Sequence, residues 1–308
     1  MGDRSGARDA GYQLGVVVVT YNNQDTIVAL LDSLPDALDG VRARVVVVDN
    51  GSGDGTPELV RSRSDCELVE STNDGYSAGI NAGVRALGNA ECVLILNPDT
   101  TLHAQSVQPL LDEVTDPQVG VVAPRTVGTD GSLTLTLGRT PTAIRTLGTS
   151  RARRSWLSER LHDPSEYETR REVDWAVGAA LLVTLPCHNA VGGWDESYFL
   201  YSEEVDFCLA ARDRGFITVY QPASTVVHHE GGSGVRPDTH ALQAVNRVRL
   251  YRRRHHLVAS SIYLVFAALQ ELKWGVRGAE GSWRAIRALL VPSTRPPVLG
   301  AQTHWVPQ

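Results

Sequence analysis

Residues 93–102 read VLILNPDTTL, and the acid near the end of this stretch decides how the fold is understood. The apolar residues 93–96 predict a strand that is buried in a sheet. The run stops at Asn97 and Pro98, and Asp99 follows at once. A buried strand that ends by presenting a carboxylate is typical of a sheet that binds a ligand at one edge.

Strands and helices alternate before this stretch. Buried strands are predicted at 15–21 (GVVVVTY), 44–50 (RVVVVDN) and 66–72 (CELVEST). The helical spacing of apolar residues predicts helices at 26–34 (TIVALLDSL) and 77–87 (SAGINAGVRAL). Apolar strands joined by helices predict an α/β fold whose parallel sheet is covered on both faces.

Three of these strands end in polar residues. The first ends in Thr20, Tyr21 and Asn22, the second ends in Asp49, and the fourth ends in the segment 97–99. A ligand of a parallel sheet binds beyond the carboxyl ends of its strands. The sequence therefore predicts a ligand site at this edge of the sheet.

The loops at this edge exclude three common ligands of α/β proteins. A dinucleotide needs a glycine-rich turn after the first strand, but the segment TYNNQDT has no glycine, which disfavours a nicotinamide dehydrogenase. The sequence of a P-loop is also absent. The segment DNGSGDGTPELV resembles a calcium loop, but its twelfth residue is Val60, where a bidentate Glu is required.

Composition and charge limit the function further. The chain has 308 residues, 42% hydrophobic and 21% charged, which is typical of a globular protein. Its net charge of −6 is uneven, because residues 245–295 hold ten Lys or Arg and only two Glu. An acidic body with a basic C-terminal segment argues against a nucleic-acid binder, whereas the segment suits an anionic lipid surface.

The cysteines and the apolar runs predict where the protein resides. Its four cysteines form no Cys-x-x-Cys pair, which favours a reduced, cytoplasmic location without structural zinc. Residues 1–14 lack the apolar stretch of a signal peptide and are expected to be a flexible tail. The longest apolar run, 257–269, is too short to span a bilayer. We therefore expect contact with the inner face of the membrane at most.

Five motifs together carry a family resemblance. They are VVVVTYNN, VVVVDNGSGDGT, NDGYSAGINAGV, LILNPDT and GGWDESYFLYSEEVDFCLAARDRGF, in this order along residues 15–233. In sequence and order they resemble the family 2 inverting glycosyltransferases, and most closely a bacterial rhamnosyltransferase-like branch. The resemblance implies a GT-A fold, which is a Rossmann-like mixed sheet for nucleotide-diphospho-sugars, followed here by a C-terminal helical segment.

The domain boundaries follow from this resemblance and from the charge pattern. A flexible N-terminal tail is expected at 1–14 and a basic amphipathic helical segment at 245–308. The catalytic domain is expected at 15–244, with a nucleotide-binding half at 15–101 and an acceptor-binding half at 102–244.

The resemblance also implies a reaction. We expect transfer of a sugar from a nucleotide-diphosphate donor, with L-rhamnose from dTDP-rhamnose as the first choice. The acceptor would be a hydroxyl of a glycan or of a lipid-linked sugar in cell-wall or polysaccharide assembly. Two alternatives stay open: a UDP-hexose-dependent transferase acting on a polysaccharide or natural product, and a catalytically silent module that binds sugar nucleotides. The oligomeric state is not predicted.

The leaving diphosphate accounts for the acid at the strand end. A divalent metal, Mg²⁺ or Mn²⁺, would stabilise its growing negative charge and is held by hard oxygen ligands. The resemblance makes Asp99 one ligand, although Asn97 stands where the family often has a first Asp. The resemblance also implies a metal- or diphosphate-binding histidine from the pair His228 and His229, and we choose His228. A purely structural histidine pair is the alternative. An Asp that only caps the following segment is the structural alternative for Asp99.

The nucleotide contacts are also implied by the resemblance. Asp49 would accept a hydrogen bond from the N–H of a pyrimidine base. The remaining candidates line the base, the ribose or the diphosphate, and they are Thr20, Tyr21, Asn22, Asn73, Gly75, Asn81 and Asn97. For Gly79 and Gly83 the alternative is close packing between a helix and the sheet.

The acceptor-binding half supplies the general base and the acceptor contacts. Glu203, Glu204 and Asp206 lie within four residues of one another, and their repulsion should raise at least one pKa toward the range of proton transfer. The resemblance makes Glu204 the base, with Glu203 as the alternative. The acceptor candidates are Trp175, Gly178, Trp194 and Asp195, although either tryptophan also suits the core.

The basic C-terminal segment has two interpretations. Its Arg residues alternate with Leu, Ile, Trp and Tyr at helical spacing, as in helices that pack on a domain or lie in a membrane interface. Packing would explain the apolar face but not the concentration of Arg, so the sequence favours the interface.

Overall fold

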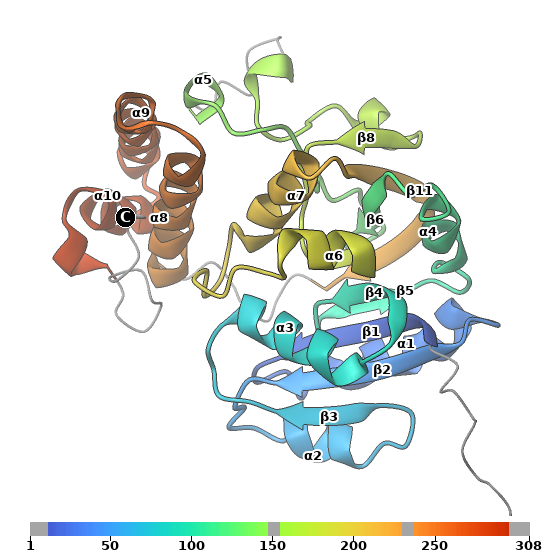
Figure 1. Ribbon diagram of the computed structural model, residues 1–308. Coiled ribbons are helices and arrows are strands. Elements are labelled where there is room, and N and C mark those ends of the chain that lie inside the picture. The colour runs from blue at the N-terminus through green and yellow to red at the C-terminus, as the bar shows by residue number, and fades with distance from the viewer. Residues whose placement is uncertain (1–11, 147–154, 230–236, 296–308) are drawn as a thin grey trace, which may run out of the picture.

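The computed structural model describes residues 12–146, 155–229 and 237–295 (Figure 1). Nine strands form the central sheet, in the order β3-β2-β1-β4-β10-β6-β11-β5, with β8 also paired to β11. Their bounds are β1 Tyr12–Thr20, β2 Ala43–Asp49, β3 Glu67–Glu70, β4 Ala90–Leu96, β5 Thr100–Leu102, β6 Val119–Val127, β8 Arg171–Val173, β10 Ala180–Thr184 and β11 Ile217–His228. A two-stranded sheet joins β7 (Leu137–Gly138) to β9 (Trp175–Ala176).

The sheet is mixed, as the GT-A resemblance implies. Strands β1 to β4 are parallel to one another, so the expectation of a parallel sheet is confirmed for this half. The second half makes the sheet mixed, because β10 runs antiparallel to both β4 and β6, and β5 and β8 run antiparallel to β11. An apolar strand buried on both faces looks the same in sequence whichever way it runs.

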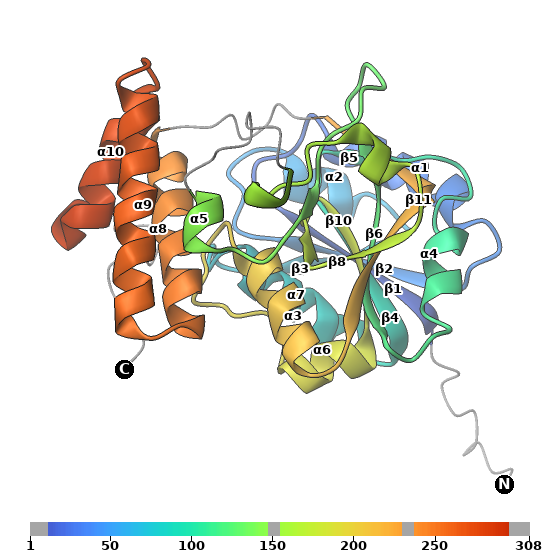
Figure 2. The ribbon, with the colours of Figure 1, turned by 90° about the horizontal axis from the view of Figure 1, so that it is seen from above.

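Helices cover both faces of this sheet, as predicted (Figures 1 and 2). Helices α1 (Ile27–Leu38), α2 (Thr56–Arg61) and α4 (Gln108–Glu113) pack on one face, and α3 (Tyr76–Leu87), α6 (Leu185–Val191) and α7 (Glu203–Asp213) pack on the other. Along β1 the valines alternate between the two cores. A Cβ on Gly83 would lie 2.5 Å from Val17, and one on Gly79 would lie 2.6 Å from Val19. These glycines therefore serve close helix–sheet packing.

Three C-terminal helices form a separate small bundle on the side of α7, shown in orange and red in Figures 1 and 2. They are α8 (Pro237–Arg254), α9 (Leu257–Gly275) and α10 (Glu280–Leu290), and a short helix α5 (Ala143–Thr146) packs against α9. The bundle has its own apolar core. The predicted boundary at 244/245 is wrong because it falls inside α8, and the buried face of this helix begins before its first arginine. The boundary after residue 14 is also displaced, because β1 begins at Tyr12.

The arginines of α8 bind the catalytic domain. Arg247 pairs with Glu159 at 2.5 Å, Arg253 pairs with Asp195, and Arg254 pairs with Asp213. Packing therefore explains much of the arginine content that the sequence argument assigned to a membrane.

Helix α9 instead carries an exposed apolar stripe. Its members are 41–73% exposed and follow a spacing of four and three residues. They are Val258, Ile262, Val265, Leu269 and Leu272, with Val276 directly after the helix. Within the described residues, α9 is also the one helix long and apolar enough to cross a membrane, with a mean hydropathy of 1.2. The apolar run at 257–269 is thus only part of a helix of 19 residues, because Glu271 and Lys273 interrupt the run but not the helix.

Candidate active site

The ends of β1, β2 and β4 form the floor of the site. Thr20 and Asp49 are register partners at the ends of β1 and β2, and the amide of Asn50 donates to the Thr20 carbonyl at 2.9 Å. The amide of Asn97, directly after β4, donates to the Ala179 carbonyl beside β10. The predicted edge of polar strand ends is therefore present.

The loops after β1 and β2 are joined by the predicted nucleotide contacts themselves. Asn22 has a left-handed φ of 56°, its amide donates to Ser52 Oγ at 2.8 Å, and its Oδ1 accepts from the Gly53 amide at 2.8 Å. Asp49 is 2% exposed and accepts from the amides of Gly51 and Ser52 at 3.1 and 2.8 Å. The Ser52 hydroxyl also donates to Asp49 Oδ1 at 2.5 Å. Because a carboxylate has about four acceptor positions, about one is left on Asp49 for a ligand.

The other predicted nucleotide contacts differ in what their side chains do. Thr20 is buried and donates to Asn23 Oδ1 at 3.1 Å, whereas Tyr21 and Asn73 are exposed. The amide group of Asn81 is used by another part of the chain: its Nδ2 donates to the Trp194 carbonyl at 2.8 Å and its Oδ1 accepts from the Trp194 amide at 3.0 Å. Asn81 thus holds the loop before α7, and its contact with a nucleotide stays a prediction.

Gly75 is required where the donor half meets the acceptor half. Its φ is +103°, which favours glycine, and a Cβ there would lie 2.6 Å from the Phe199 carbonyl oxygen. The next amide, of Tyr76, donates to that same oxygen at 2.8 Å. Gly75 thus allows the chain at Phe199 to lie directly against the start of α3.

Asp99 and His228 lie side by side, as predicted. Asp99 Oδ1 is 3.2 Å from His228 Nε2, because β5 pairs with the end of β11. His229 points elsewhere: its Nε2 is 3.1 Å from Thr101 Oγ1. The carboxylate oxygen suits either Mg²⁺ or Mn²⁺, and the imidazole nitrogen beside it favours Mn²⁺ over the harder Mg²⁺. Among the described residues no group of three or more His, Cys, Asp or Glu forms a metal cage, so further ligands would come from the donor and water.

Tyr76 is a site residue that the sequence interpretation missed. Its hydroxyl donates to Asn97 Oδ1 at 2.7 Å, beside the candidate metal ligand Asp99. Burial raises the pKa of Tyr76 well above its usual value, and the carboxylates of Glu203, Asp99 and Glu204 raise that pKa further. Tyr76 therefore lies between the acids of the two halves. Its place between the glycines of the motif NDGYSAG was the available signal.

The acids of the acceptor half occupy the first turn of α7. Glu203 is 6% exposed and its Oε2 has no hydrogen-bond partner in the described part of the chain. Burial, and secondly the charge of Glu204, raises the pKa of Glu203 well above its usual value. Burial also raises the pKa of Glu204 and of Asp206. Burial rather than mutual repulsion is thus the main cause of the pKa shifts predicted from the sequence.

Of the acceptor candidates, one lies beside the acids, two lie in the core and one contacts the C-terminal bundle. A Cβ on Gly178 would lie 3.4 Å from Glu204 Cβ, so this glycine leaves space beside the acid. Trp175 and Trp194 are each 3% exposed, which favours the core alternative for both. Trp194 stacks on Phe207 with the ring centroids 4.5 Å apart. Asp195 is the partner of Arg253 in α8.

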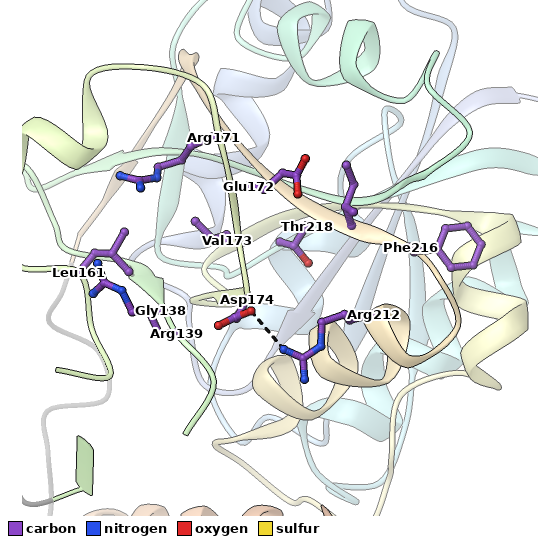
Figure 3. Close-up of a pocket in the computed structure, with 11 residues that line it drawn as sticks. Gly138, Arg139, Leu161, Arg171, Glu172, Val173, Asp174, Arg212, Phe216 and Thr218 are labelled. Carbon is purple, nitrogen blue, oxygen red and sulfur yellow. Dashed lines mark hydrogen bonds and ion pairs between the residues drawn. The ribbon is translucent and has the colours of Figure 1, made fainter. Parts of the chain in front are cut away.

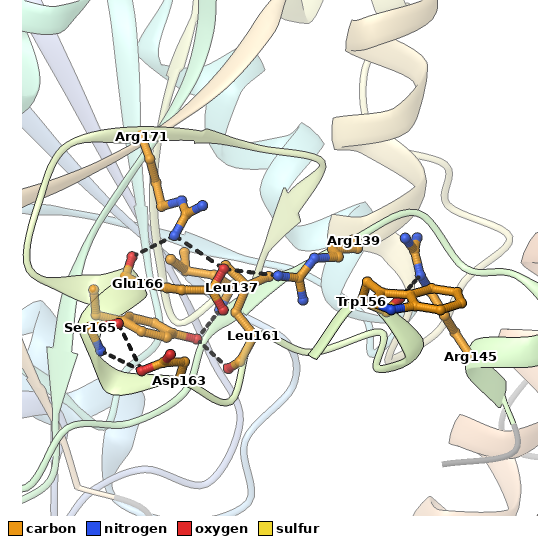
Figure 4. Close-up of polar contacts among 10 residues, drawn as sticks. Leu137, Arg139, Arg145, Trp156, Leu161, Asp163, Ser165, Glu166 and Arg171 are labelled. Atoms are coloured by element: carbon orange, nitrogen blue, oxygen red, sulfur yellow. Dashed lines mark hydrogen bonds and ion pairs between the residues drawn. The ribbon is translucent and has the colours of Figure 1, made fainter. Parts of the chain in front are cut away.

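A cavity of 320 Å³ lies at the other end of α7 (Figure 3). There Arg212 donates to Asp174 at 3.1 Å, and none of the predicted site residues lines the cavity. Two of its lining residues, Arg139 and Arg171, bind Glu166 at 2.9 and 3.3 Å (Figure 4). These contacts brace the frame around β7 to β9 and do not form part of the site.

Comparison with known proteins identifies the family of this chain. The family model described as "Glycosyl transferase family 2" matches residues 15–177, more than half of the chain. The chain belongs to glycosyl transferase family 2. As a glycosyltransferase, it is an enzyme that uses a nucleotide-sugar donor. The resemblance stated from the five motifs is thereby confirmed.

Two relatives of this glycosyltransferase are themselves named as sugar transferases. The N-acetylglucosaminyl-diphospho-decaprenol L-rhamnosyltransferase of Mycobacterium tuberculosis is 31% identical over 86% of this chain and 90% of that protein. The low-salt glycan biosynthesis hexosyltransferase Agl10 of Haloferax volcanii is 30% identical over 65% of this chain and 61% of its own length.

Solved structures confirm the GT-A fold of this glycosyltransferase. GalNAc-T7 with UDP, GalNAc and Mn²⁺ has a TM-score of 0.61 and 14% identity, covering 79% of this chain and 48% of that one. The Pyrobaculum calidifontis mannosyltransferase PcManGT with GDP-Man and Mn²⁺ has a TM-score of 0.55 and 18% identity, covering 96% and 85%.

Proposed function

We propose that this glycosyltransferase moves L-rhamnose from dTDP-rhamnose to a hydroxyl of a lipid-linked sugar diphosphate during cell-wall assembly. The observation that carries the proposal is the similarity to the mycobacterial L-rhamnosyltransferase over 86% of this chain and 90% of that one. The match extends through most of both proteins, so it includes the acceptor half as well as the donor half.

The donor half supplies the contacts to the nucleotide in this proposal. Asp49 accepts from the base, and the loops joined by Asn22 and Ser52 are preformed beside it. The described loops are held by backbone and side-chain hydrogen bonds, so little ordering is needed when the donor binds.

Asp99 and His228 would hold a divalent metal at the donor diphosphate. The metal would stabilise the negative charge that develops on the leaving group. The 3.2 Å approach of the carboxylate oxygen to the imidazole nitrogen supports this assignment. Tyr76, which donates to Asn97, would keep the strand end in place beside the diphosphate.

Glu204 acts as the general base on the acceptor hydroxyl. Its raised pKa, caused by burial, is suited to accepting a proton near neutral pH. The acceptor oxygen attacks the anomeric carbon from the side opposite the diphosphate, so the configuration inverts. Gly178 beside Glu204 leaves room for the acceptor. Glu203, which is more deeply buried, would stay protonated and structural.

The enzyme would work on the inner face of the membrane. The apolar stripe of α9 is exposed, and basic and aromatic side chains lie near its C-terminal end. These are Lys273, Trp274, Arg277, Trp283, Arg284 and Arg287, and such a belt is typical of helices that lie in a lipid interface. A lipid-linked acceptor would then reach the site from the surface on which the enzyme rests.

A direct test is a transfer assay with purified full-length protein. dTDP-rhamnose and a short-chain polyprenyl-diphospho-GlcNAc are supplied with Mn²⁺ or Mg²⁺, and the product is identified by mass spectrometry and NMR. We expect one rhamnose to be added with inverted configuration. Transfer from UDP-hexoses but not from dTDP-rhamnose would instead support the hexosyltransferase alternative, which the similarity to Agl10 favours. Binding of the donors without any transfer would reject both.

A further inference from the structure

The chain that leads into the catalytic acids has an unusual backbone. Tyr201 and Ser202, directly before Glu203, have φ values of 70° and 74°, in the left-handed region. A residue other than glycine is strained in this region and persists there only where its surroundings fix it. The side chain of Ser202 makes no capping hydrogen bond to α7. The local sequence therefore does not explain this conformation.

Helix α8 supplies contacts that fix it. Nδ2 of Asn246 donates to the carbonyls of Leu200 and Tyr201 at 2.9 and 3.2 Å, and Asn246 is 1% exposed. These carbonyls belong to the two peptide groups that flank the Tyr201 Cα. Holding both groups sets the φ and ψ of Tyr201, and with them the direction in which the chain enters α7.

A second residue of α8 holds the same segment one turn further along. Nη1 of Arg249 donates to the Ser197 carbonyl at 2.6 Å, and Nη2 bonds Ser197 Oγ. The Arg249 guanidinium also lies over the ring of Tyr198, 4.6 Å from its centroid. Arg249 is 5% exposed, so it is a buried part of the fold.

The segment held by α8 also contacts the donor half. Phe199 accepts from the amide of Tyr76, and Asn81 binds both Trp194 and Glu196. Residues 194–202 are thus fixed on one side by α3 and on the other by α8. Only the two together determine where α7 begins.

We propose that Asn246 and Arg249 are positioning residues for the transfer reaction. They hold the left-handed turn at Tyr201 and Ser202 so that α7 begins at Glu203 and presents Glu204 to the acceptor. Neither residue touches the substrates in this proposal. The inference rests on the proposed role of Glu204 as general base, and it makes the C-terminal bundle part of the catalytic unit.

Two variants of the full-length protein separate this role from general stability. Asn246→Leu keeps the side-chain size but removes both donors. We expect kcat to fall about 10²-fold, as for a catalytic group displaced by about 1 Å, while the Kd for dTDP changes less than about threefold. Gln243→Ala, at an exposed position of the same helix, is the matched control and should leave kcat and Kd unchanged.

A rescue experiment tests the backbone argument itself. Ser202→Gly allows the left-handed φ without strain and removes no capping bond. In the Asn246→Leu background it should recover about tenfold of the lost kcat. A purely stabilising role would give loss of folded protein without this recovery. Should Asn246→Leu not fold, Arg249→Lys and the pair Arg249→Lys with Ser202→Gly are measured in the same way.

A further variant separates failure of the positioning role from failure of the proposed function. Glu204→Gln is run in the same assay, with the donor and acceptor identified by the transfer assay above. If Glu204→Gln keeps its activity, the base assignment is wrong. If Glu204→Gln is inactive while Asn246→Leu turns over normally, or loses kcat without any rescue by Ser202→Gly, the positioning role is overturned.

Discussion

Asp99 Oδ1 and His228 Nε2 lie 3.2 Å apart, although one residue follows the fourth strand and the other ends the last. The antiparallel pairing of β5 with β11, in which His228 is the register partner of Thr100, brings them together. The pairing thus joins the donor half to the acceptor half at the point where the diphosphate is expected. Each half contributes one of the two candidate metal ligands.

The first prediction concerns this pair. Asp99→Asn keeps the shape but removes the charge, so Mn²⁺-dependent binding of dTDP should weaken at least about tenfold, measured by calorimetry with and without Mn²⁺. His228→Ala should have a similar effect. His229→Ala is the control, because its ring faces Thr101 and should leave dTDP binding nearly unchanged. Equal Mn²⁺ dependence in the parent protein and in Asp99→Asn would refute the assignment.

The second prediction concerns the general base. Glu204→Gln keeps hydrogen bonding but accepts no proton, so kcat should fall about 10²–10⁴-fold. The Kd for dTDP should stay the same, because the nucleotide half is unaltered. Product configuration is determined by NMR in parallel. A product with retained configuration is incompatible with this mechanism, and activity lost in Glu203→Gln instead would move the base by one residue.

The third prediction concerns the dependence of stability on pH. Burial raises the pKa of Glu203, so the folded protein takes up a proton between the ordinary pKa and the raised one. Stability should therefore fall as the pH rises through this window, which begins near the ordinary glutamate pKa of 4.5. Glu203→Gln removes this cost, and its Tm at pH 7.5 should exceed that of the parent by about 2–4 °C.

The same comparison at low pH is the check on the third prediction. Near pH 4 Glu203 is largely protonated in both the folded and the unfolded parent protein, so the Tm difference between Glu203→Gln and the parent should shrink. Glu91→Gln, which alters an exposed acid, should give no such pH-dependent difference. A Tm difference that stays constant between pH 4 and pH 7.5 would mean that Glu203 is not the cause.

The fourth prediction concerns the stripe on α9. Ile262→Glu with Leu269→Glu places two charges on this exposed face, so flotation with phosphatidylglycerol-containing vesicles at low salt should be lost. Leu59→Glu, at an exposed apolar position of α2, is the control and should float normally. If the parent protein does not float but is a dimer that the double substitution dissociates, the stripe is a contact between two copies of the chain.

The sequence predicted the donor half closely because local signals there agree with the final structure. The valine-rich runs and the helical spacing at 26–34 and 77–87 follow from local pattern, whereas Gly75 was selected by the family resemblance. The direction of β10 could not be predicted, since an apolar strand carries no mark of its orientation. Asp99 and His228 were placed together by family resemblance, not by the chain's own pattern.

Burial was the property that the sequence predicted least well. Trp175 and Trp194 are acceptor candidates in the sequence, but both are buried in the structure. An aromatic residue looks the same in a motif whether it faces a ligand or the core. The arginines of α8 were assigned to a membrane, whereas several have acidic partners that come from distant parts of the chain. Partners of this kind are visible only after folding.

The contacts of Asn246 and Arg249 with the segment before α7 have a consequence for synthesis in the cell. A ribosome makes about 5–20 residues per second, so about 8–30 seconds separate the synthesis of Leu102 from that of Arg254. During that interval the nascent chain already has the strands that would bind a nucleotide. It lacks the helix that directs the base toward its target. Catalytic competence would therefore arise only near the end of translation, after His228 has joined Asp99 and α8 has fixed the start of α7.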